Sequence, residues 1–262
     1  MMSLEDLLLN LSGGNPLLLG LLGGLVTALL NALGATPVLF IKKLPERLSD
    51  LGMGFAAGVM LAASFTSLIV PGIEIGGIIP VIIGIALGAA MVNFADMIVP
   101  HMHVIIGREG IATDRLRGIW LFVLAMTLHN MPEGLAVGVD FGSGNIKEAI
   151  VLMLAIGLQN IPEGLSVGFS ILAEGSKSRL YAYLAAVISG LVEPPLSLVG
   201  ASTVVLAKSI LPYAMGFAAG AMIFVISDEI IPESNRIGHE KISTYGLIVG
   251  FILMLYMDVA LS

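Results

Sequence analysis

The chain has 262 residues, of which 57% are hydrophobic and only 12% charged, with a formal net charge of −7 and no cysteine. Soluble domains carry about twice this share of charged residues, so the composition indicates a polytopic membrane protein forming a single transmembrane domain over residues 1–262. The lack of cysteine excludes disulfides and thiolate metal sites, and no basic patch suited to nucleic acid is present.

Long apolar runs predict an all-α membrane protein with eight transmembrane helices, because each run approaches the roughly 20 residues that cross a bilayer. The expected spans are Leu17–Phe40, Gly52–Pro71, Gly77–Val99, Arg117–Val139, Lys147–Ala173, Leu180–Leu206, Leu211–Pro232 and Ser243–Leu261. Polar segments connect them, among them His101–Leu116 and Asp140–Asn145. Asp258 is expected to be solvated near the end of the last span.

The basic residues predict how the chain is oriented. All of them except Lys147 and Lys208 fall in the first, third, fifth and seventh loops. Short cytoplasmic loops are enriched in Lys and Arg. Both termini are therefore expected outside the cytoplasm, in a multi-pass protein of the plasma (inner) membrane.

A six-residue similarity links the second and seventh spans. Residues 53–58 read MGFAAG, and residues 215–220 read the same six letters. These spans cross in opposite directions, so spans 1–3 and 6–8 are predicted to be inverted repeats around a central pair, spans 4 and 5. Chance recurrence of Gly-Ala runs in glycine-rich helices is the other interpretation.

The central pair carries two near-copies of one polar motif. Residues 129–134 read HNMPEG and residues 159–164 read QNIPEG. On a helix, His129 lies one turn before Glu133, and Gln159 lies one turn before Glu163. The proline in each copy frees a backbone carbonyl, which a span tolerates only where it faces protein or a wet cavity. An ionised side chain at the bilayer centre costs roughly 2.5–3.5 kcal/mol, so such residues mark ion paths.

The liganding atoms in this pattern suit a divalent metal. Glu193, followed by two prolines in span six, repeats the pairing of glutamate with proline. Three carboxylates with imidazole and amide groups fit Zn²⁺ or a neighbouring ion. One divalent ion would leave a single negative charge on the three glutamates and two would leave a single positive charge, so either occupancy is favoured over the empty ionised site. The candidate ligands are His129, Asn130, Glu133, Gln159, Asn160, Glu163 and Glu193.

These motifs and the eight-span layout resemble the ZIP family of divalent-metal transporters, in particular its compact prokaryotic branch. The resemblance implies metal import toward the cytoplasm through a site formed by spans 4, 5 and 6. It implies one metal at His129, Glu133, Gln159 and Glu163. It implies a second metal at Asn130, Glu133, Asn160, Glu163 and Glu193. The chain departs from the family at Gln159, where many relatives carry His, and at Asn160, where some carry Asp.

A second set of polar residues suggests an exit path. Its members are Asp96, His101, His103, Glu229 and Glu233. Family resemblance favours a transient metal station there, while helix capping and solvation explain the acids of span seven equally well. Ser64 and Ser67 are candidates for lining the path.

Two other functions fit the sequence less well than transport. An intramembrane metalloprotease needs two His and a catalytic Glu around an open metal site, and only His129 lies deep in a span. A proton or cation channel explains the acids but not the groups one turn before each Glu. We therefore expect no enzyme and no resident cofactor, with Zn²⁺, Fe²⁺, Mn²⁺, Cd²⁺ and Co²⁺ all compatible as cargo. The expected partners are these ions and the lipid bilayer, and the glycine-rich faces are compatible with a homodimer.

Overall fold

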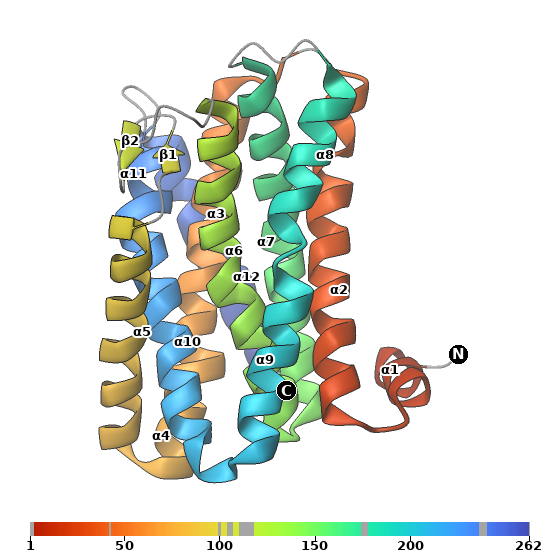
Figure 1. The fold of residues 1–262 in the computed structure, drawn as a ribbon, viewed down its shortest axis with the longest axis vertical. Coiled ribbons are helices and arrows are strands. Elements are labelled where there is room, and N and C mark those ends of the chain that lie inside the picture. Colours follow the sequence, from red (N-terminus) through yellow and green to blue (C-terminus); the bar gives the residue numbers. More distant parts are fainter. Residues whose placement is uncertain are drawn as a thin grey trace.

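The computed structural model describes residues 3–41, 43–98, 101–103, 107–109, 118–173, 178–235 and 240–261, and the long helices run side by side as an upright bundle (Figure 1). The helices are α1 (Leu4–Ser12), α2 (Pro16–Ala35), α3 (Glu46–Ala63), α4 (Val70–Gly76), α5 (Ile78–Ile98), α6 (Gly118–Ser143), α7 (Ile146–Ala173), α8 (Arg179–Gly190), α9 (Glu193–Leu206), α10 (Leu211–Val225), α11 (Ile231–Ser234) and α12 (Glu240–Leu261). Two short antiparallel strands, β1 (His101–His103) and β2 (Gly107–Glu109), form a pair that the sequence did not predict.

Seven helical stretches in the described part of the chain are long and apolar enough to cross a membrane. They are Pro16–Leu39, Glu46–Gly76, Ile78–Ile98, Ile146–Leu172, Arg179–Leu206, Lys208–Ile230 and Glu240–Ala260. These stretches correspond to seven of the eight predicted spans. The remaining prediction falls on α6, which has 26 residues. The protein is therefore a helical membrane protein.

Helix α1 precedes the first span and was not predicted. Ser3 caps it: its hydroxyl oxygen accepts a hydrogen bond from the Asp6 backbone N–H at 3.0 Å. The Ser3 hydroxyl and backbone N–H in turn donate to the Asp6 carboxylate, and these bonds lower the pKa of Asp6 from its usual value. In Figure 1, α1 projects sideways from the foot of α2.

Two of the spans switch from α-helix to π-helix near one end. A π-helical segment, Ser64–Ile69, follows α3, and another, Ile226–Ile230, follows α10. Pro71 and Pro232 come just after them. Proline cannot donate to the carbonyl four residues earlier and clashes with it, so the helix widens by one residue there.

The sixth predicted span is broken rather than continuous. Helix α8 ends at Gly190 and α9 begins at Glu193, with a turn between them. Pro194 and Pro195 have no N–H groups to continue the α8 hydrogen bonds. The break places Glu193 at the start of a helix in the middle of the span.

Glycine brings the helices of two pairs into backbone contact. Between α3 and α12, a Cβ added at Gly58 would overlap the carbonyl oxygen of Leu247. Between α5 and α10, a Cβ at Gly88 would overlap that of Phe217. The reciprocal glycines are Gly250 on α12 and Gly220 on α10. We call these two contacts the glycine seams.

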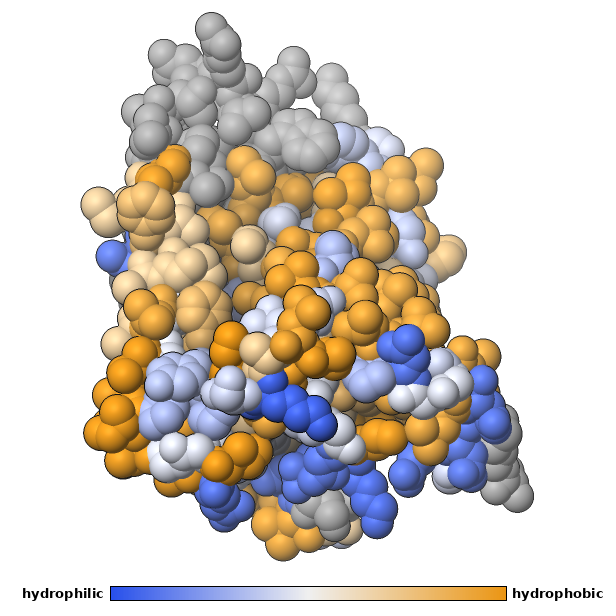
Figure 2. All heavy atoms as spheres, turned by 60° about the horizontal axis from the view of Figure 1, so that its bottom comes forward, coloured by the Kyte–Doolittle hydropathy of each residue, from blue (hydrophilic) through white to orange (hydrophobic). Residues whose placement is uncertain are grey.

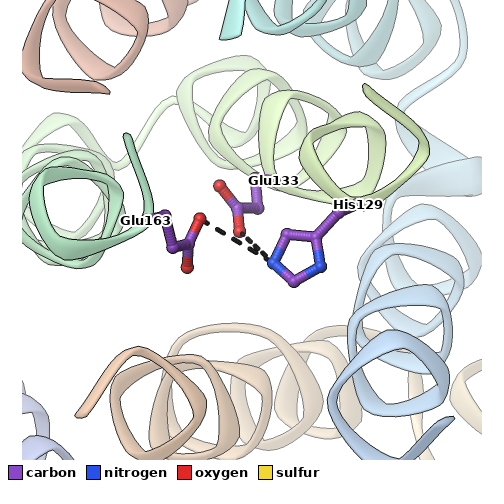
Figure 3. Close-up of side chains that lie close together, drawn as sticks. All are labelled: His129, Glu133 and Glu163. Atoms are coloured by element: carbon purple, nitrogen blue, oxygen red, sulfur yellow. Dashed lines mark ion pairs between the residues drawn. The ribbon is translucent and has the colours of Figure 1, made fainter. Parts of the chain in front are cut away.

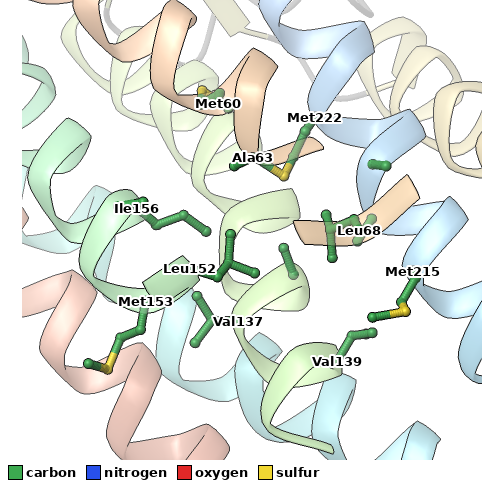
Figure 4. Packing of buried hydrophobic residues seen from close by; sticks show 14 of the residues in the cluster. Met60, Ala63, Leu68, Val137, Val139, Leu152, Met153, Ile156, Met215 and Met222 are labelled. Atoms are coloured by element: carbon green, nitrogen blue, oxygen red, sulfur yellow. The ribbon is translucent and has the colours of Figure 1, made fainter. Parts of the chain in front are cut away.

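The helices form two groups. Helices α2, α6, α7, α8 and α9 pack mainly on one another, and so do α3, α4, α5, α10 and α12. Buried apolar side chains fill the space where α6 and α7 meet α10 and the α3 segment (Figure 4). The outer faces carry exposed Leu, Ile and Val, as a lipid-facing surface requires, and Figure 2 shows hydrophilic residues gathered at one end of the bundle.

Candidate metal centre

The two copies of the motif lie on neighbouring helices, α6 and α7, with Pro132 and Pro162 inside them. All seven predicted ligand residues are at most 2% exposed. Spacing of four residues puts His129 and Glu133 on one face of α6. The fold therefore buries these polar groups together in the interior of the bundle.

His129, Glu133 and Glu163 form the centre of the site (Figure 3). The His129 Nε2 atom lies 3.8 Å from Glu133 Oε1 and 3.7 Å from Glu163 Oε2. One ligand atom from each residue lies within 4.8 Å of the other two. In Figure 3 the two carboxylates and the Nε2 edge of the imidazole border the same space, so one ion could contact all three.

Gln159 orients one of these carboxylates. Its Nε2 donates a hydrogen bond of 2.7 Å to Glu133 Oε1. The Gln159 Oε1 atom has no hydrogen-bond partner among the described residues. Because the amide nitrogen is occupied by Glu133, the amide oxygen is the atom left to bind an ion.

Asn160 and Glu193 form a second polar pair beside the first. The Asn160 Nδ2 atom donates to Glu193 Oε1 at 3.0 Å and Oε2 at 3.1 Å, and to the Thr27 carbonyl of α2 at 3.3 Å. Gly134 permits this approach, because an added Cβ there would lie 2.7 Å from the Glu193 Cα and carbonyl oxygen. The Thr27 group that Asn160 contacts is a backbone carbonyl, so no sequence pattern could have revealed this contact.

Glu229 is a neighbour of His129 that the sequence analysis did not connect with it. Its Oε2 lies 3.8 Å from His129 Nδ1, the ring nitrogen on the far side from Glu133 and Glu163. Glu229 belongs to the π-helical segment after α10, in the other group of helices. A carboxylate at Nδ1 favours the imidazole orientation in which Nε2 is free to bind a metal.

The remaining exit-path residues are only partly described. Asp96 is buried near the end of α5, where it borders a small cavity with Met131 and Pro132 of α6. The backbone of His101 and His103 lies in β1. The side chains of His101, His103 and Glu233 lie outside the described residues, so the exit path stays a prediction.

Many ligand-type atoms of the site lack a partner. Among the described residues, seven buried atoms of the motif have no hydrogen bond: His129 Nε2, Asn130 Oδ1, Glu133 Oε2, Gln159 Oε1, Asn160 Oδ1, Glu163 Oε1 and Glu163 Oε2. Buried polar atoms are almost always paired in proteins. All seven are nitrogen or oxygen atoms of types that can coordinate a metal ion.

Comparison with known proteins identifies relatives along nearly the whole chain. A family profile described as "ZIP Zinc transporter" matches residues 107–258. The zinc transporter ZIPB of Bordetella bronchiseptica is 42% identical over 96% of this chain and 85% of its own length. The zinc transporter GufA of Myxococcus xanthus is 38% identical over 93% of this chain and 99% of its own length. Human zinc transporter ZIP11 is 35% identical over 96% of this chain and all of its own length.

Proposed function

Because the chain belongs to the ZIP family of zinc transporters, we propose that it carries divalent cations, Zn²⁺ first among them, across a membrane. The carrying site is the cluster of His129, Glu133 and Glu163 on α6 and α7. The observation that supports this most strongly is the set of seven buried ligand atoms without partners. A site built only to hold helices together would pair these atoms with one another.

The types of ligand at the site favour reversible binding of the transported ion. Imidazole, amide and carboxylate ligands suit Zn²⁺ and also accept Fe²⁺, Mn²⁺, Co²⁺ and Cd²⁺. Without thiolates, no cysteine cage retains the ion. The His129 and Glu163 side chains are at most 2% exposed, so an ion cannot enter or leave until the helices around it move.

A second ion is proposed beside the first. Its ligands would be the Asn130, Asn160 and Glu193 side chains, with Glu133 and Glu163 bridging the two ions. Unpaired oxygens on Asn130, Asn160 and both bridging glutamates support this arrangement. The Glu193 carboxylate already accepts two hydrogen bonds from Asn160, so the second ion should bind more weakly than the first.

We also propose that the protein crosses the membrane eight times. Helix α6 would be the eighth span, in addition to the seven stretches identified by length and hydropathy. Spans 1–3 and 6–8 would be inverted repeats. The π-helical segments support this, because each begins eleven residues after the start of its MGFAAG motif, at Ser64 and at Ile226. The two glycine seams would be equivalent under the same symmetry. The distribution of Lys and Arg supports both termini outside the cytoplasm. Import to the cytoplasm across the plasma (inner) membrane is proposed from the resemblance to the family.

Uptake into liposomes tests the proposal. The wild-type protein would be reconstituted with a trapped zinc-sensitive dye and compared with Glu133→Ala. A matched control is Glu5→Ala, a glutamate of α1 outside the bundle interior. We expect Zn²⁺ influx in the wild type and the control and none in Glu133→Ala. Equal influx in all three would place the pathway elsewhere, and no influx in any would refute transport.

A further inference from the structure

A groove on the side of the bundle is lined by none of the metal-centre residues. Its volume is about 420 Å³, and residues of α5, α6, α9 and α10 line it. Val139 of α6 and Ala218 of α10 lie at its floor and are 3% and 1% exposed. Leu87 of α5 and Val199 of α9 form its rim and are 57% and 51% exposed. We call it the lateral groove. Its rim faces the surroundings of the bundle, which for a helical membrane protein are lipid.

The lining of the lateral groove suits a hydrocarbon chain. None of the lining side chains is charged, and only Thr203 and Tyr213 are polar. The Thr203 hydroxyl donates to the Val199 carbonyl of its own helix at 2.9 Å, so it offers no free donor to a ligand. A chain in the groove would make dispersion contacts with four helices, whereas a chain on a convex surface makes fewer. The groove therefore favours a lipid chain that is held over one that exchanges freely.

The lateral groove has the length and the depth of an acyl chain in one leaflet. Its lining spans Gly84–Met91 on α5 and Leu196–Thr203 on α9, which corresponds to about 10 Å along each helix axis. The hydrocarbon of one leaflet is about 15 Å thick. The groove begins near the turn between α9 and α10, at the foot of the bundle in Figure 1, and extends to Leu135, two residues beyond Glu133 on α6. A chain entering at the foot would therefore reach the level of the metal centre.

A basic side chain lies at the foot of the lateral groove. Lys208 begins the short 3-10 turn that joins α9 to α10, and Ile210 of the same turn lines the groove. The Lys208 side chain is exposed and forms no ion pair within the described part of the chain. Tyr213, which is 38% exposed, lines the same end, and tyrosine is enriched at the depth of lipid headgroups. An ammonium group in this position is complementary to the phosphate of a phospholipid.

We propose that the lateral groove binds one acyl chain of a phospholipid whose anionic headgroup contacts Lys208. Phosphatidylglycerol fits better than phosphatidylcholine, because the choline ammonium offsets the attraction between phosphate and lysine. A helix of a second copy does not fit. Over its length the groove has a cross-section of about 40 Å², roughly half that of an α-helix with its side chains, which is about 10–12 Å across.

The lateral groove lies on the boundary between the two groups of helices. Helices α6 and α9 belong to one group, and α5 and α10 belong to the other. The shape of the groove changes when one group moves past the other, and movement of helices is required for an ion to leave the buried metal centre. A chain that fits the present shape stabilises this arrangement and opposes the movement. The bound lipid should therefore slow transport, a role that rests on the proposed transport function, whereas lipid binding does not.

Native mass spectrometry of the full-length protein, released from detergent and titrated with phosphatidylglycerol, tests the binding without a transport assay. Ala214→Phe fills the groove, because Ala214 lines it and is half-buried. Ala86→Phe is the matched control, because Ala86 is exposed on α5 but does not line the groove. We expect one retained phosphatidylglycerol per chain in the wild type and the control, and none in Ala214→Phe. Equal retention in both variants would overturn the proposal, and dimers that dissociate in Ala214→Phe with unchanged bound lipid would assign the groove to a second copy.

Two further substitutions keep the test decisive. Thr203→Phe replaces Ala214→Phe if that variant fails to fold, because Thr203 is exposed on α9 and its hydroxyl bonds only to its own helix. Lys208→Gln tests the headgroup contact, with Lys147→Gln, an exposed lysine of α7 that does not adjoin the groove, as its control. Lys208→Gln should weaken phosphatidylglycerol binding about fivefold, and Lys147→Gln should leave it unchanged. Equal affinity for phosphatidylglycerol and phosphatidylcholine, or equal effects of the two lysine substitutions, would overturn the headgroup assignment.

Uptake into liposomes tests the consequence for transport. Adding phosphatidylglycerol to a phosphatidylcholine membrane should slow Zn²⁺ uptake by the wild-type protein by up to about fivefold, and should leave the rate of Lys208→Gln unchanged. A wild-type rate that does not depend on phosphatidylglycerol would overturn the regulatory role. If the wild type shows no uptake in either membrane, the transport proposal fails while the result on lipid binding stands.

Discussion

Replacing Asn160 by aspartate should turn a hydrogen-bond donor into a metal ligand and make the protein depend on metal for its stability. In the wild type, the Asn160 amide nitrogen donates to both oxygens of Glu193, at 3.0 and 3.1 Å. It also donates to the Thr27 carbonyl. An aspartate carboxylate can make none of these bonds and instead places a second negative charge against Glu193.

The size of the effect follows from these contacts. Losing a hydrogen bond to a charged, buried group costs about 1.5–3 kcal/mol. Two carboxylates about 3 Å apart repel by roughly 5 kcal/mol at an effective dielectric constant of about 20, part of which protonation relieves. We expect metal-free Asn160→Asp to lose about 3–5 kcal/mol of stability. Zn²⁺ at a hundred times its dissociation constant should restore about 2.7 kcal/mol.

Thermal unfolding of the purified protein, with a chelator or with Zn²⁺, measures both effects. Asn160→Ala is the matched control, because it loses the same hydrogen bonds without adding a charge or a ligand. We expect the control to be destabilised by about 1.5–3 kcal/mol and to gain no more from Zn²⁺ than the wild type does. The reasoning is refuted if metal-free Asn160→Asp unfolds at the wild-type temperature, or if Zn²⁺ stabilises it no more than it stabilises the control.

Three further outcomes are expected. Glu163→Gln should weaken Zn²⁺ binding by about 100-fold or more, measured by competition with a zinc chelator, since both oxygens of Glu163 lack protein partners; an affinity within threefold of the wild type would contradict the ligand assignment. Gly134→Ala should destabilise the protein by about 1–3 kcal/mol and reduce uptake, because its methyl group meets the Glu193 backbone, whereas Gly72→Ala, whose nearest contact is 3.1 Å, should have less effect. Uptake should decline in acid, because protons compete with the metal for His129 and the carboxylates; a rate that rises as the pH falls would argue for proton-driven transport.

The positions of the metal-centre residues could be predicted because helical spacing is regular. Four-residue intervals place His129 beside Glu133 whatever the tertiary contacts are, and length with hydropathy identifies the spans. Glu193 could be found for a different reason: a carboxylate in an apolar segment is costly, so its presence beside two prolines suggests a function.

The contacts between distant helices could not be predicted from the same patterns. The approach of Glu229 to His129 depends on how α10 packs against α6, and the Thr27 contact uses a backbone carbonyl that every residue has. Asp140 was placed in a loop because it stands beside glycine, serine and asparagine. Local composition indicates a turn there, but α6 continues to Ser143 because its last turn is packed against other helices.

The glycine seams have a consequence for the lipid around the protein. A helix pair in backbone contact has little freedom to change its crossing angle, so α3 with α12 and α5 with α10 each tilt as one stiff unit. When the hydrocarbon thickness of a bilayer differs from that of the protein, tilting is the usual adjustment. Such a tilt would shift the two groups of helices relative to each other. The shift would occur at the boundary where their side chains pack and where His129 faces Glu229. The transport rate should therefore vary with the acyl-chain length of the host membrane.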